Sequence, residues 1–246
     1  MRSDPGHRDE QIQSLLLDIE GTTTPVDFVY KVLFPYARTR LEDFIRRNWR
    51  SELIESDVAR LAEEHAADLH HERHPPLWRE DRKADSVVAY LHWLMDQDRK
   101  STGLKSIQGK IWQAGYEAGE LHGEVFPDVP PAFVRWRARN RTLCIFSSGS
   151  VLAQRLLFSR TNAGDLTPYI WKYFDTTTGP KGEPESYRMI AAACARAPEE
   201  ILFVSDMVLE LDAAQSAGFN TALCVRGKVP EPAGSHRIIR SFDEIP

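Results

Sequence analysis

The sequence has few cysteines, no long apolar run and no leader-like amino terminus. Its three cysteines are far apart and show no C-x-x-C spacing, which excludes a disulfide framework or a zinc knuckle and fits a reducing compartment. No segment approaches the roughly 18 consecutive apolar residues of a membrane helix, and residues 1–11 are polar. We therefore expect a cytoplasmic protein without a membrane partner.

The sequence also lacks an excess of basic residues. Its 246 residues carry 31 Lys and Arg against 36 Asp and Glu, a formal net charge of -5. Without a block of Lys and Arg, a nucleic-acid backbone is not expected as a partner, although a local basic pocket for a small anion remains compatible with this charge. A hydrophobic content of 42% is enough for a substantial core in one large domain or two smaller ones.

The order of the periodic segments predicts an α/β fold. An apolar run at 15–17 is typical of a buried strand, and beyond it apolar residues recur at three- and four-residue steps to about Gly123, which predicts helices. From Phe126 onward strands and helices alternate, which implies a parallel sheet with right-handed crossovers. We expect a polar N-terminal tail at 1–11, a Rossmann-like, doubly wound parallel sheet core at 12–25 and 126–246, and a helical cap inserted after the first strand at 26–125.

Short apolar runs define the other expected elements of this core. Helices are expected at 130–138 and 151–158, and a third ends near Gly218, a residue type that suits a helix C-cap. The expected later strands are 142–146, 201–204 and 221–225.

Two acids, Asp18 and Glu20, follow the first expected strand directly. Side chains two residues apart on a strand point the same way, and open α/β sheets bind ligands at this carboxyl edge. Two carboxylates held together can bind a divalent cation, or divide nucleophilic and proton-transfer roles between them. The alternative is a strand that runs into a polar turn, which an isolated D-x-E would favour.

Hydroxyl groups follow the strand at 142–146. Ser147 and Ser148 precede Gly149 and the start of a helix, where free backbone amides can cradle an anion. Helix capping is an equally good explanation for Ser150, but less so for Ser147, which continues directly from the strand.

A lysine and a further acid complete the set of candidates. Lys181 precedes an amphipathic run and can present a fixed positive charge to a phosphate, although alone it would be a solvated loop lysine. Asp206 follows the strand at 201–204, with Glu210 in the helix after it. A third carboxylate at the same edge would complete an oxygen site for Mg²⁺, whereas alone it would be an N-cap aspartate.

A dense histidine stretch, His70–His74, suggests a metal site at first sight. Its spacing matches neither H-E-x-x-H nor a zinc finger, and charges and prolines flank it. We assign it no function.

The ordered set of Asp18 with Glu20, Ser147, Lys181 and Asp206 resembles the four motifs of the haloacid dehalogenase-like hydrolases, over nearly the whole chain. Glu20 replaces the aspartate that most phosphatases of this superfamily have there. Relatives that cleave carbon–halogen or carbon–phosphorus bonds generally lack an acid at this position, so Glu20 favours phosphoester chemistry.

A narrower resemblance is to the acireductone synthases, the enolase-phosphatases of methionine salvage, which have glutamate at the position of Glu20. Several of the segments that carry it lie outside the shared superfamily motifs, so the match is specific. These segments are Asp18–Thr23, Leu33–Tyr36, Asp98–Lys100, Leu104–Lys105, Gln108–Gly109, Gly115–Tyr116 and Ser147–Val151.

This resemblance implies a bifunctional reaction and a site. The substrate would be the phosphorylated diketone 2,3-diketo-5-methylthiopentyl 1-phosphate, which is enolised and then dephosphorylated to 1,2-dihydroxy-3-keto-5-methylthiopentene. One Mg²⁺ per chain would be bound by Asp18, Asp206 and the carbonyl oxygen of Glu20, and the protein would be a monomer. Asp18 would be the nucleophile and Glu20 the acid–base group. The phosphoryl group would be held by Ser147, Ser148 and Lys181.

The sequence leaves two questions open: which function the protein has, and which residue removes the substrate carbon proton. A general small-metabolite phosphatase of the same superfamily and a non-catalytic phosphometabolite-binding module are the alternatives. Lys105 and Glu124 are candidates for removing the substrate carbon proton, but a salt-bridged surface role explains each equally well. We expect the cap to exclude water from the reactive dicarbonyl, as lids do.

Overall fold

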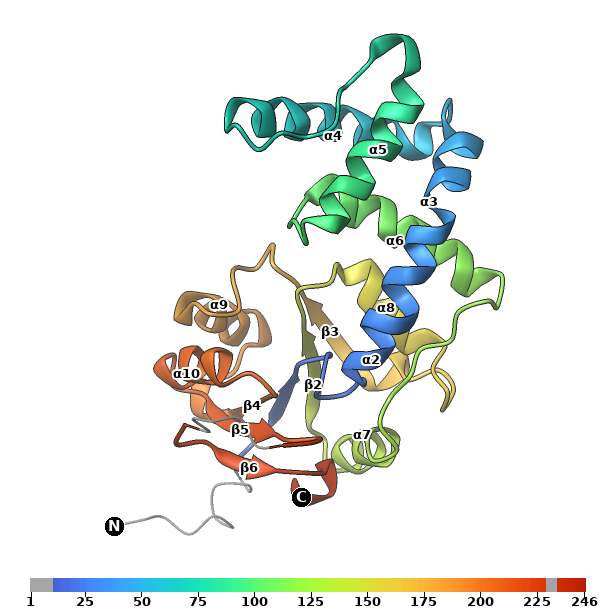
Figure 1. The fold of residues 1–246 in the computed structure, drawn as a ribbon. Helices are drawn as coiled ribbons and strands as arrows, with labels where there is room; N and C mark the ends of the chain where they lie inside the picture. Colours follow the sequence, from blue (N-terminus) through green and yellow to red (C-terminus); the bar gives the residue numbers. More distant parts are fainter. Residues whose placement is uncertain (1–10, 229–233) are drawn as a thin grey trace. The chain divides into compact units, whose positions relative to one another are not determined.

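The computed structural model describes residues 11–228 and 234–246, and the chain forms two compact units (Figure 1). The core unit comprises the chain up to Val29 together with His122–Pro246, and the helical unit comprises Tyr30–Leu121. All but the last residue of the expected tail at 1–11 lies outside the described residues. The expected limits of core and cap, at 25/26 and 125/126, stay a prediction.

The core unit is built on one parallel sheet with the strand order β3-β2-β1-β4-β5-β6 (Figure 1). All of its neighbouring strands pair in parallel, and β1 lies inside the sheet between β2 and β4. The predicted α/β class with a doubly wound parallel sheet is therefore confirmed. The strands are β1 Ser14–Leu17, β2 Thr142–Phe146, β3 Ile170–Phe174, β4 Ile201–Ser205, β5 Asn220–Cys224 and β6 Arg237–Ile239.

Helices cover both faces of this sheet (Figure 1). Leu16 and Phe203 face α9 and α10, where a buried cluster includes Tyr187 and Leu211. On the opposite face α7 packs on β2 and α8 on β3. The helices are α7 Val129–Ala138, α8 Val151–Ser159, α9 Pro184–Cys194 and α10 Val208–Ser216, and short 3₁₀ turns are η3 Thr167–Tyr169, η4 Pro198–Glu200 and η5 Phe242–Glu244.

The register of the central strands sets the position of the strand ends. Leu17 lies opposite Ile145 on one side and Val204 on the other. Because parallel strands end at the same edge of a sheet, the residues that follow β1, β2 and β4 meet at one place.

The helical unit follows β1 after the short α2 and a π-helical turn, η1. Its interior holds paired charges: Lys110 donates to Asp57, and the buried Asp68 accepts from Tyr90 and Arg99. No helix within 11–228 or 234–246 is long and apolar enough to cross a membrane. The short α2, Val26–Phe28, belongs to the core unit, and η1, Val29–Leu33, leads into the helical unit. The further elements of the helical unit are α3 Phe34–Asn48, α4 Glu52–His70, η2 Glu80–Arg82, α5 Lys83–Asp96 and α6 Thr102–Glu117.

Candidate active site

Asp18 is fixed by the sheet and by the turn that follows it. The apolar β1 is fully buried, and the Asp18 amide continues its ladder by donating to the Val204 carbonyl at 3.0 Å. The chain then curls back, with the amides of Thr22, Thr23 and Thr24 all donating to the carbonyl of Ile19. Only 2% of Asp18 is exposed, so its carboxylate is held rigidly at the edge of the sheet.

Lys181 joins Asp18 to a second carboxylate. Its Nζ lies 2.5 Å from Asp18 Oδ1 and 2.6 Å from Glu210 Oε2, and the lysine is 8% exposed. Tyr187, on α9, fixes the lysine backbone by donating its hydroxyl to the Lys181 carbonyl at 2.7 Å. Although burial disfavours the ammonium, Asp18 and Glu210 outweigh it and raise the pKa of Lys181, which therefore stays charged.

Glu210 is a site residue whose role the sequence analysis missed. It stands four residues after Asp206, on the first turn of α10, and the Ser205 hydroxyl donates to its Oε2 at 2.9 Å. Burial and the charge of Asp18 raise its pKa. The available signal was its position in the first turn of the helix that follows Asp206, which keeps it close to the same edge of the sheet.

Asp206 packs against the turn after β1. A Cβ added to Gly21 would lie 2.2 Å from Asp206 Oδ2, so only glycine fits there, and Gly21 also has a positive φ of 74°. Burial, followed by the charges of Asp18 and Glu210, raises the pKa of Asp206 to about 7. Asp206 and the turn at residues 20–21 therefore belong to one constellation with Asp18.

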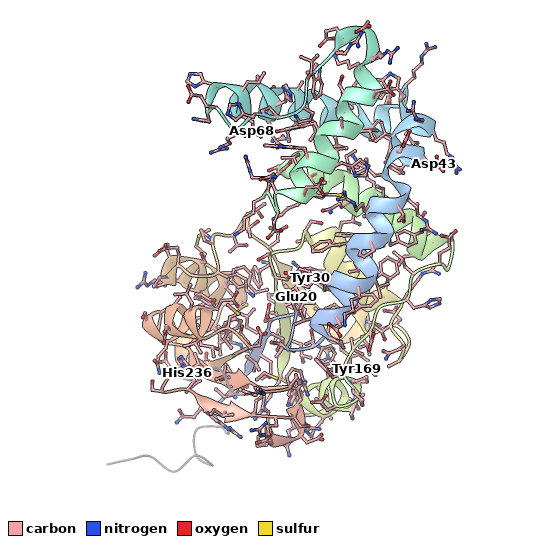
Figure 2. The ribbon with its side chains drawn as sticks, viewed as in Figure 1. Glu20, Tyr30, Asp43, Asp68, Tyr169 and His236 are labelled. Atoms are coloured by element: carbon pink, nitrogen blue, oxygen red, sulfur yellow. The ribbon has the colours of Figure 1, made fainter. Side chains whose placement is uncertain are left out.

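Glu20 lies just past β1 (Figure 2). Burial raises its pKa to about 7, and the nearby charge of Asp18 acts in the same direction. A carboxyl group with this pKa is able both to donate and to accept a proton near neutral pH.

Ser147 belongs to a braced loop at the end of β2. It is buried, its amide donates to the Phe174 carbonyl at 3.2 Å, and its Oγ accepts the Gly149 amide at 3.1 Å. Ser150 caps α8 by accepting the Ala153 amide, as the capping alternative predicted. Ser148 is exposed.

Gln154 is a second residue that sequence reasoning missed. Its amide nitrogen donates to the carbonyls of Gly149 and Phe174, both at 2.8 Å, and only 1% of the residue is exposed. It therefore ties the loop after β2 to the end of β3. A glutamine inside an expected helix gives no signal of this role.

The acids suit a hard divalent cation. Within the described ranges, no three His, Cys, Asp or Glu side chains form a cluster of the kind that holds a metal. The expected ligands need only two side-chain carboxylates, from Asp18 and Asp206, and the carbonyl oxygen of Glu20. Such a small set matches Mg²⁺, which keeps several waters. Burial is the main cause of the raised pKa values of Glu20 and Asp206, and the charge of Asp18 adds to it in both cases; a bound cation would offset that negative charge.

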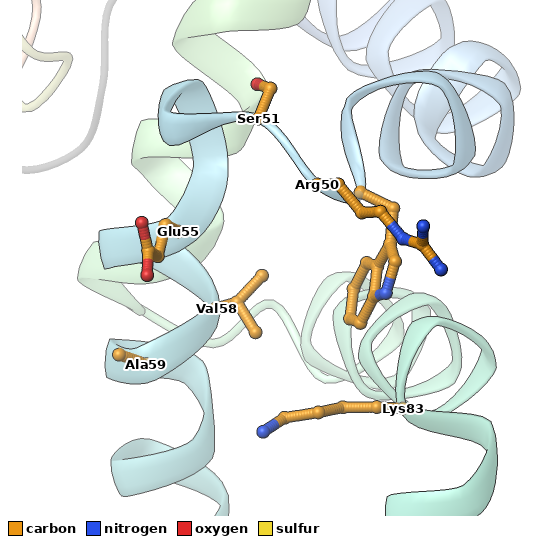
Figure 3. A pocket seen from close by; sticks show the side chains of 7 residues that line it. Arg50, Ser51, Glu55, Val58, Ala59 and Lys83 are labelled. Carbon is orange, nitrogen blue, oxygen red and sulfur yellow. The ribbon is translucent and has the colours of Figure 1, made fainter.

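A hollow in the helical unit does not involve these residues (Figure 3). Its volume is about 410 Å³. The hollow is lined by Trp49, Arg50, Ser51, Glu55, Val58, Ala59 and Lys83.

The residues of His70–His74 lie at the end of α4 and in the turn beyond it, with exposed side chains.

Comparisons with known proteins identify the family and support the fold. Residues 12–218 match the model of the haloacid dehalogenase-like hydrolase family. Enolase-phosphatase E1 of Synechococcus elongatus is 52% identical, covering 95% of this chain and 98% of the relative, and that of Yersinia enterocolitica is 43% identical, covering 95% and 96%. The solved structure of the yeast UTR4 protein has a TM-score of 0.75 at 30% identity, covering 94% of this chain and 99% of that one. A dehalogenase with a TM-score of 0.55 at 17% identity shares the fold.

These matches confirm the predicted family and the predicted hydrolase class. They are full-length, so the relation extends to the helical unit as well as the sheet. They favour an enzyme over a non-catalytic binding module, and an enolase-phosphatase over a general phosphatase. The chain belongs to the enolase-phosphatase family of the haloacid dehalogenase-like hydrolases.

Proposed function

We propose that this enzyme enolises 2,3-diketo-5-methylthiopentyl 1-phosphate and then dephosphorylates it to 1,2-dihydroxy-3-keto-5-methylthiopentene, in methionine salvage and so in amino-acid biosynthesis. The observation that carries the phosphatase half is the contact of Asp18 with Lys181, at 2.5 Å in a buried site. This contact holds a carboxylate oxygen in one orientation beside a fixed positive charge. Relatives named enolase-phosphatase support the enolisation half.

One Mg²⁺ per chain would be held by Asp18, Asp206 and the main-chain oxygen of Glu20. When bound, the ion supplies charge neutralisation for the phosphate and polarisation of the substrate carbonyl. The support from this chain is the donor set itself, in which Asp206 packs against the turn at Gly21.

Asp18 attacks phosphorus through Oδ2, the oxygen that Lys181 leaves available, and the product of this step is an aspartyl phosphate. The Thr22 hydroxyl donates to Oδ2 at 3.4 Å. Lys181, Ser147 and Ser148 hold the oxygens of the transferring group. Positioning and charge neutralisation dominate phosphoryl transfer, and the buried ammonium supplies both.

Glu20 donates a proton to the leaving oxygen and then takes one from the water that cleaves the aspartyl phosphate. It is two residues from Asp18 and shares its environment, since the Asp18 charge helps to raise its pKa. Glu20 can serve both steps, because the proton that it gives to the leaving oxygen in the first step is replaced by the proton that it takes from water in the second step. We assign no residue to the removal of the substrate carbon proton.

We further propose a cytoplasmic monomer. The free thiols of the three cysteines support the reducing compartment, and the resemblance to the family supports the monomer. The charge balance argues against a nucleic acid as the main partner.

The test supplies the diketone phosphate with Mg²⁺ and follows enediol absorbance and free phosphate together. Asp18→Asn should abolish phosphate release and the acid-labile phosphoenzyme, whereas Asp43→Asn, on the exposed side of α3, should retain both. EDTA should stop the wild-type reaction. Undiminished turnover in Asp18→Asn would rule out Asp18 as the nucleophile. Ready hydrolysis of unrelated phosphate esters, together with poor hydrolysis of the diketone phosphate, would favour the general phosphatase.

A further inference from the structure

Two cysteines lie together behind the active-site edge of the sheet. Cys144 is on β2 and Cys194 is the last residue of α9, yet their sulfur atoms are 3.8 Å apart. This is hydrogen-bond distance for two thiols. Fifty residues separate them in the chain, and neither belongs to the catalytic set.

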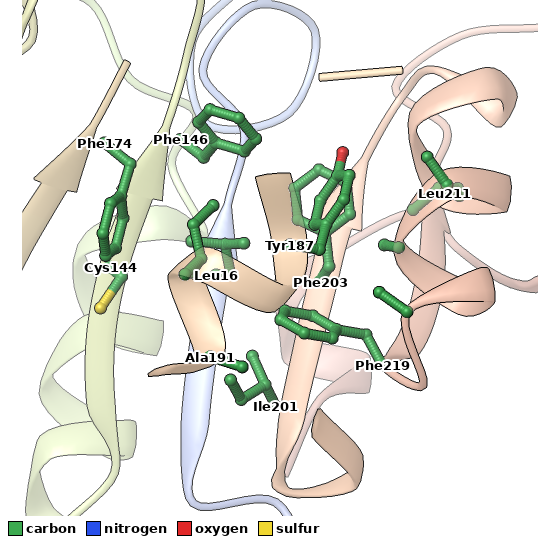
Figure 4. Packing of buried hydrophobic residues seen from close by; sticks show 14 of the residues in the cluster. Leu16, Cys144, Phe146, Phe174, Tyr187, Ala191, Ile201, Phe203, Leu211 and Phe219 are labelled. Carbon is green, nitrogen blue, oxygen red and sulfur yellow. The ribbon is translucent and has the colours of Figure 1, made fainter. Parts of the chain in front are cut away.

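The two thiols have different surroundings. Cys144 is 1% exposed and belongs to the buried cluster under α9 and α10, with its sulfur at the margin of that cluster (Figure 4). Cys194 is half-buried and therefore reachable from solvent. The sulfur that a small reagent meets first is thus that of Cys194.

Their electrostatic environment separates their roles further. The hydrogen bond between the thiols lowers the pKa of Cys194, and the charges of Lys172 and Arg196 act in the same direction. The same hydrogen bond and burial raise the pKa of Cys144. Cys194 is therefore the better nucleophile, since the thiolate is the reactive form, and Cys144 stays protonated beside it.

We propose that Cys144 and Cys194 are a redox couple, a site of reversible oxidation by hydroperoxides. The Cys194 thiolate attacks the outer oxygen of the hydroperoxide and becomes a sulfenic acid, and the peroxide leaves as an alcohol or, from hydrogen peroxide, as water. The Cys144 sulfur then attacks the Cys194 sulfur to form the disulfide, and the Cys144 thiol proton passes to the departing hydroxyl of the sulfenic acid, which leaves as water. Two thiols and one hydroperoxide thus give one disulfide, one alcohol and one water, and a dithiol reductant reverses the change.

The sulfurs need only a small movement. A disulfide bond is about 2.05 Å long, so the gap of 3.8 Å between the sulfurs must close by roughly 1.8 Å. The bond would join β2, which leads directly into Ser147, to α9, which begins three residues after Lys181. Oxidation would thus cross-link the two elements that bring these residues to the edge.

Mass spectrometry of the full chain tests the proposal without any activity assay. The result is therefore independent of the reaction proposed for the enzyme. The reduced protein is treated with a small excess of hydrogen peroxide, blocked with iodoacetamide and digested with trypsin. We expect residues 142–155 and 189–196 to appear as one disulfide-linked peptide that dithiothreitol separates. Cys224, a buried thiol on β5, should remain unlinked and serves as the internal control.

Single variants separate the steps. Cys144→Ser should trap the Cys194 sulfenic acid, which dimedone labels, whereas Cys194→Ser should give neither label nor linked peptide. Cys224→Ser should behave as wild type. Oxidised protein in which both peptides remain unlinked, or in which the linkage involves Cys224 or a second chain to the same extent, would overturn the proposal.

Discussion

Lys181 Nζ lies 2.5 Å from Asp18 Oδ1, although 163 residues separate the two along the chain. The same ammonium contacts Glu210, so that one buried cation faces two carboxylates. Attraction across this short, desolvated gap is strong, and removing the lysine takes away the cation that both carboxylates contact. The pair therefore matters for folding as well as for chemistry.

Lys181→Met should lose both stability and activity. Breaking a buried ion pair by removing one partner costs about 3 to 5 kcal/mol, since the remaining charge stays buried. Loss of a preorganised cation should lower turnover by at least about 100-fold. Urea denaturation in EDTA and phosphate release with Mg²⁺ measure the two effects. Lys228→Met, at an exposed position, is the control, and a Lys181→Met enzyme that matches it in both assays would contradict the role of the pair.

Gly21→Ala should damage the site more than the fold. Gly21 and Gly119 have nearly equal positive φ angles of 74° and 73°, but only at Gly21 would the new Cβ meet Asp206. Both alanine variants should lose about 1 kcal/mol of stability, because an L residue is strained in this conformation. Only Gly21→Ala should weaken Mg²⁺ activation, by roughly tenfold or more, which corresponds to about 1.4 kcal/mol. Equal Mg²⁺ titrations for the two variants would show that Asp206 does not depend on this packing.

Asp128 should make folding sensitive to acid. It accepts hydrogen bonds from Arg226 at 2.7 Å and from the Phe242 amide at 2.6 Å, and Arg226 in turn donates to the Thr22 carbonyl in the turn after Asp18. Burial alone would raise the pKa of Asp128, but these hydrogen bonds outweigh it and lower the pKa. Because the pKa of Asp128 is lower in the folded state, the charged carboxylate stabilises the fold fully at pH values above its unfolded-state pKa of about 3.9. This stabilisation is lost as the pH falls through the folded-state pKa.

The corresponding experiment compares Asp128→Asn with wild type. The variant should be about 2 kcal/mol less stable at pH 7, because hydrogen bonds to a charged group contribute about 1.5 to 3 kcal/mol. The difference should shrink as pH falls below 4. Thermal unfolding at pH 7, 5, 4 and 3 measures it, with Asp43→Asn as the control, since its ion pair with Arg47 is exposed. A difference that stays constant with pH would contradict the linkage.

The strands that sequence reasoning found are those whose side chains are nearly all apolar. The run at 15–17 and that at 201–204 lie inside the sheet and are buried on both faces, so their composition identifies them. β3 was missed because its exposed Trp171 and half-buried Lys172 interrupt the apolar pattern. β6 was missed because it is a three-residue edge strand, with only Ile239 buried.

The site residues also divide into those that the position of a buried strand predicts and those that only side-chain contacts reveal. Asp18 and Asp206 follow buried strands, and topology alone brings such residues to one edge. Glu210 acts through its ion pair with Lys181, and Gln154 acts through side-chain hydrogen bonds to the Gly149 and Phe174 carbonyls. No periodicity encodes contacts of that kind, so they required coordinates.

Gln154 provides the last prediction, because it braces the loop after β2, which carries the proposed phosphate-binding residues Ser147 and Ser148, without belonging to that loop. Its two hydrogen bonds end on carbonyls of β3 and of the loop after Ser147, so its loss should loosen that loop while leaving Asp18 and Lys181 in place. Two lost hydrogen bonds at about 1 kcal/mol each correspond to roughly a 30-fold effect.

Gln154→Ala should therefore show this loss in kcat/KM for the phosphorylated substrate and weaker inhibition by inorganic phosphate. Gln113→Ala is the matched control, because Gln113 bonds only to Glu117 on the surface of α6 among the described residues. If Gln154→Ala unfolds early, Gln154→Met keeps the length of the side chain and removes the donor without burying a charge, and it should show the same kinetic loss with less change in stability. A variant that is destabilised yet binds phosphate like wild type would show that Gln154 supports the fold alone and does not position the loop.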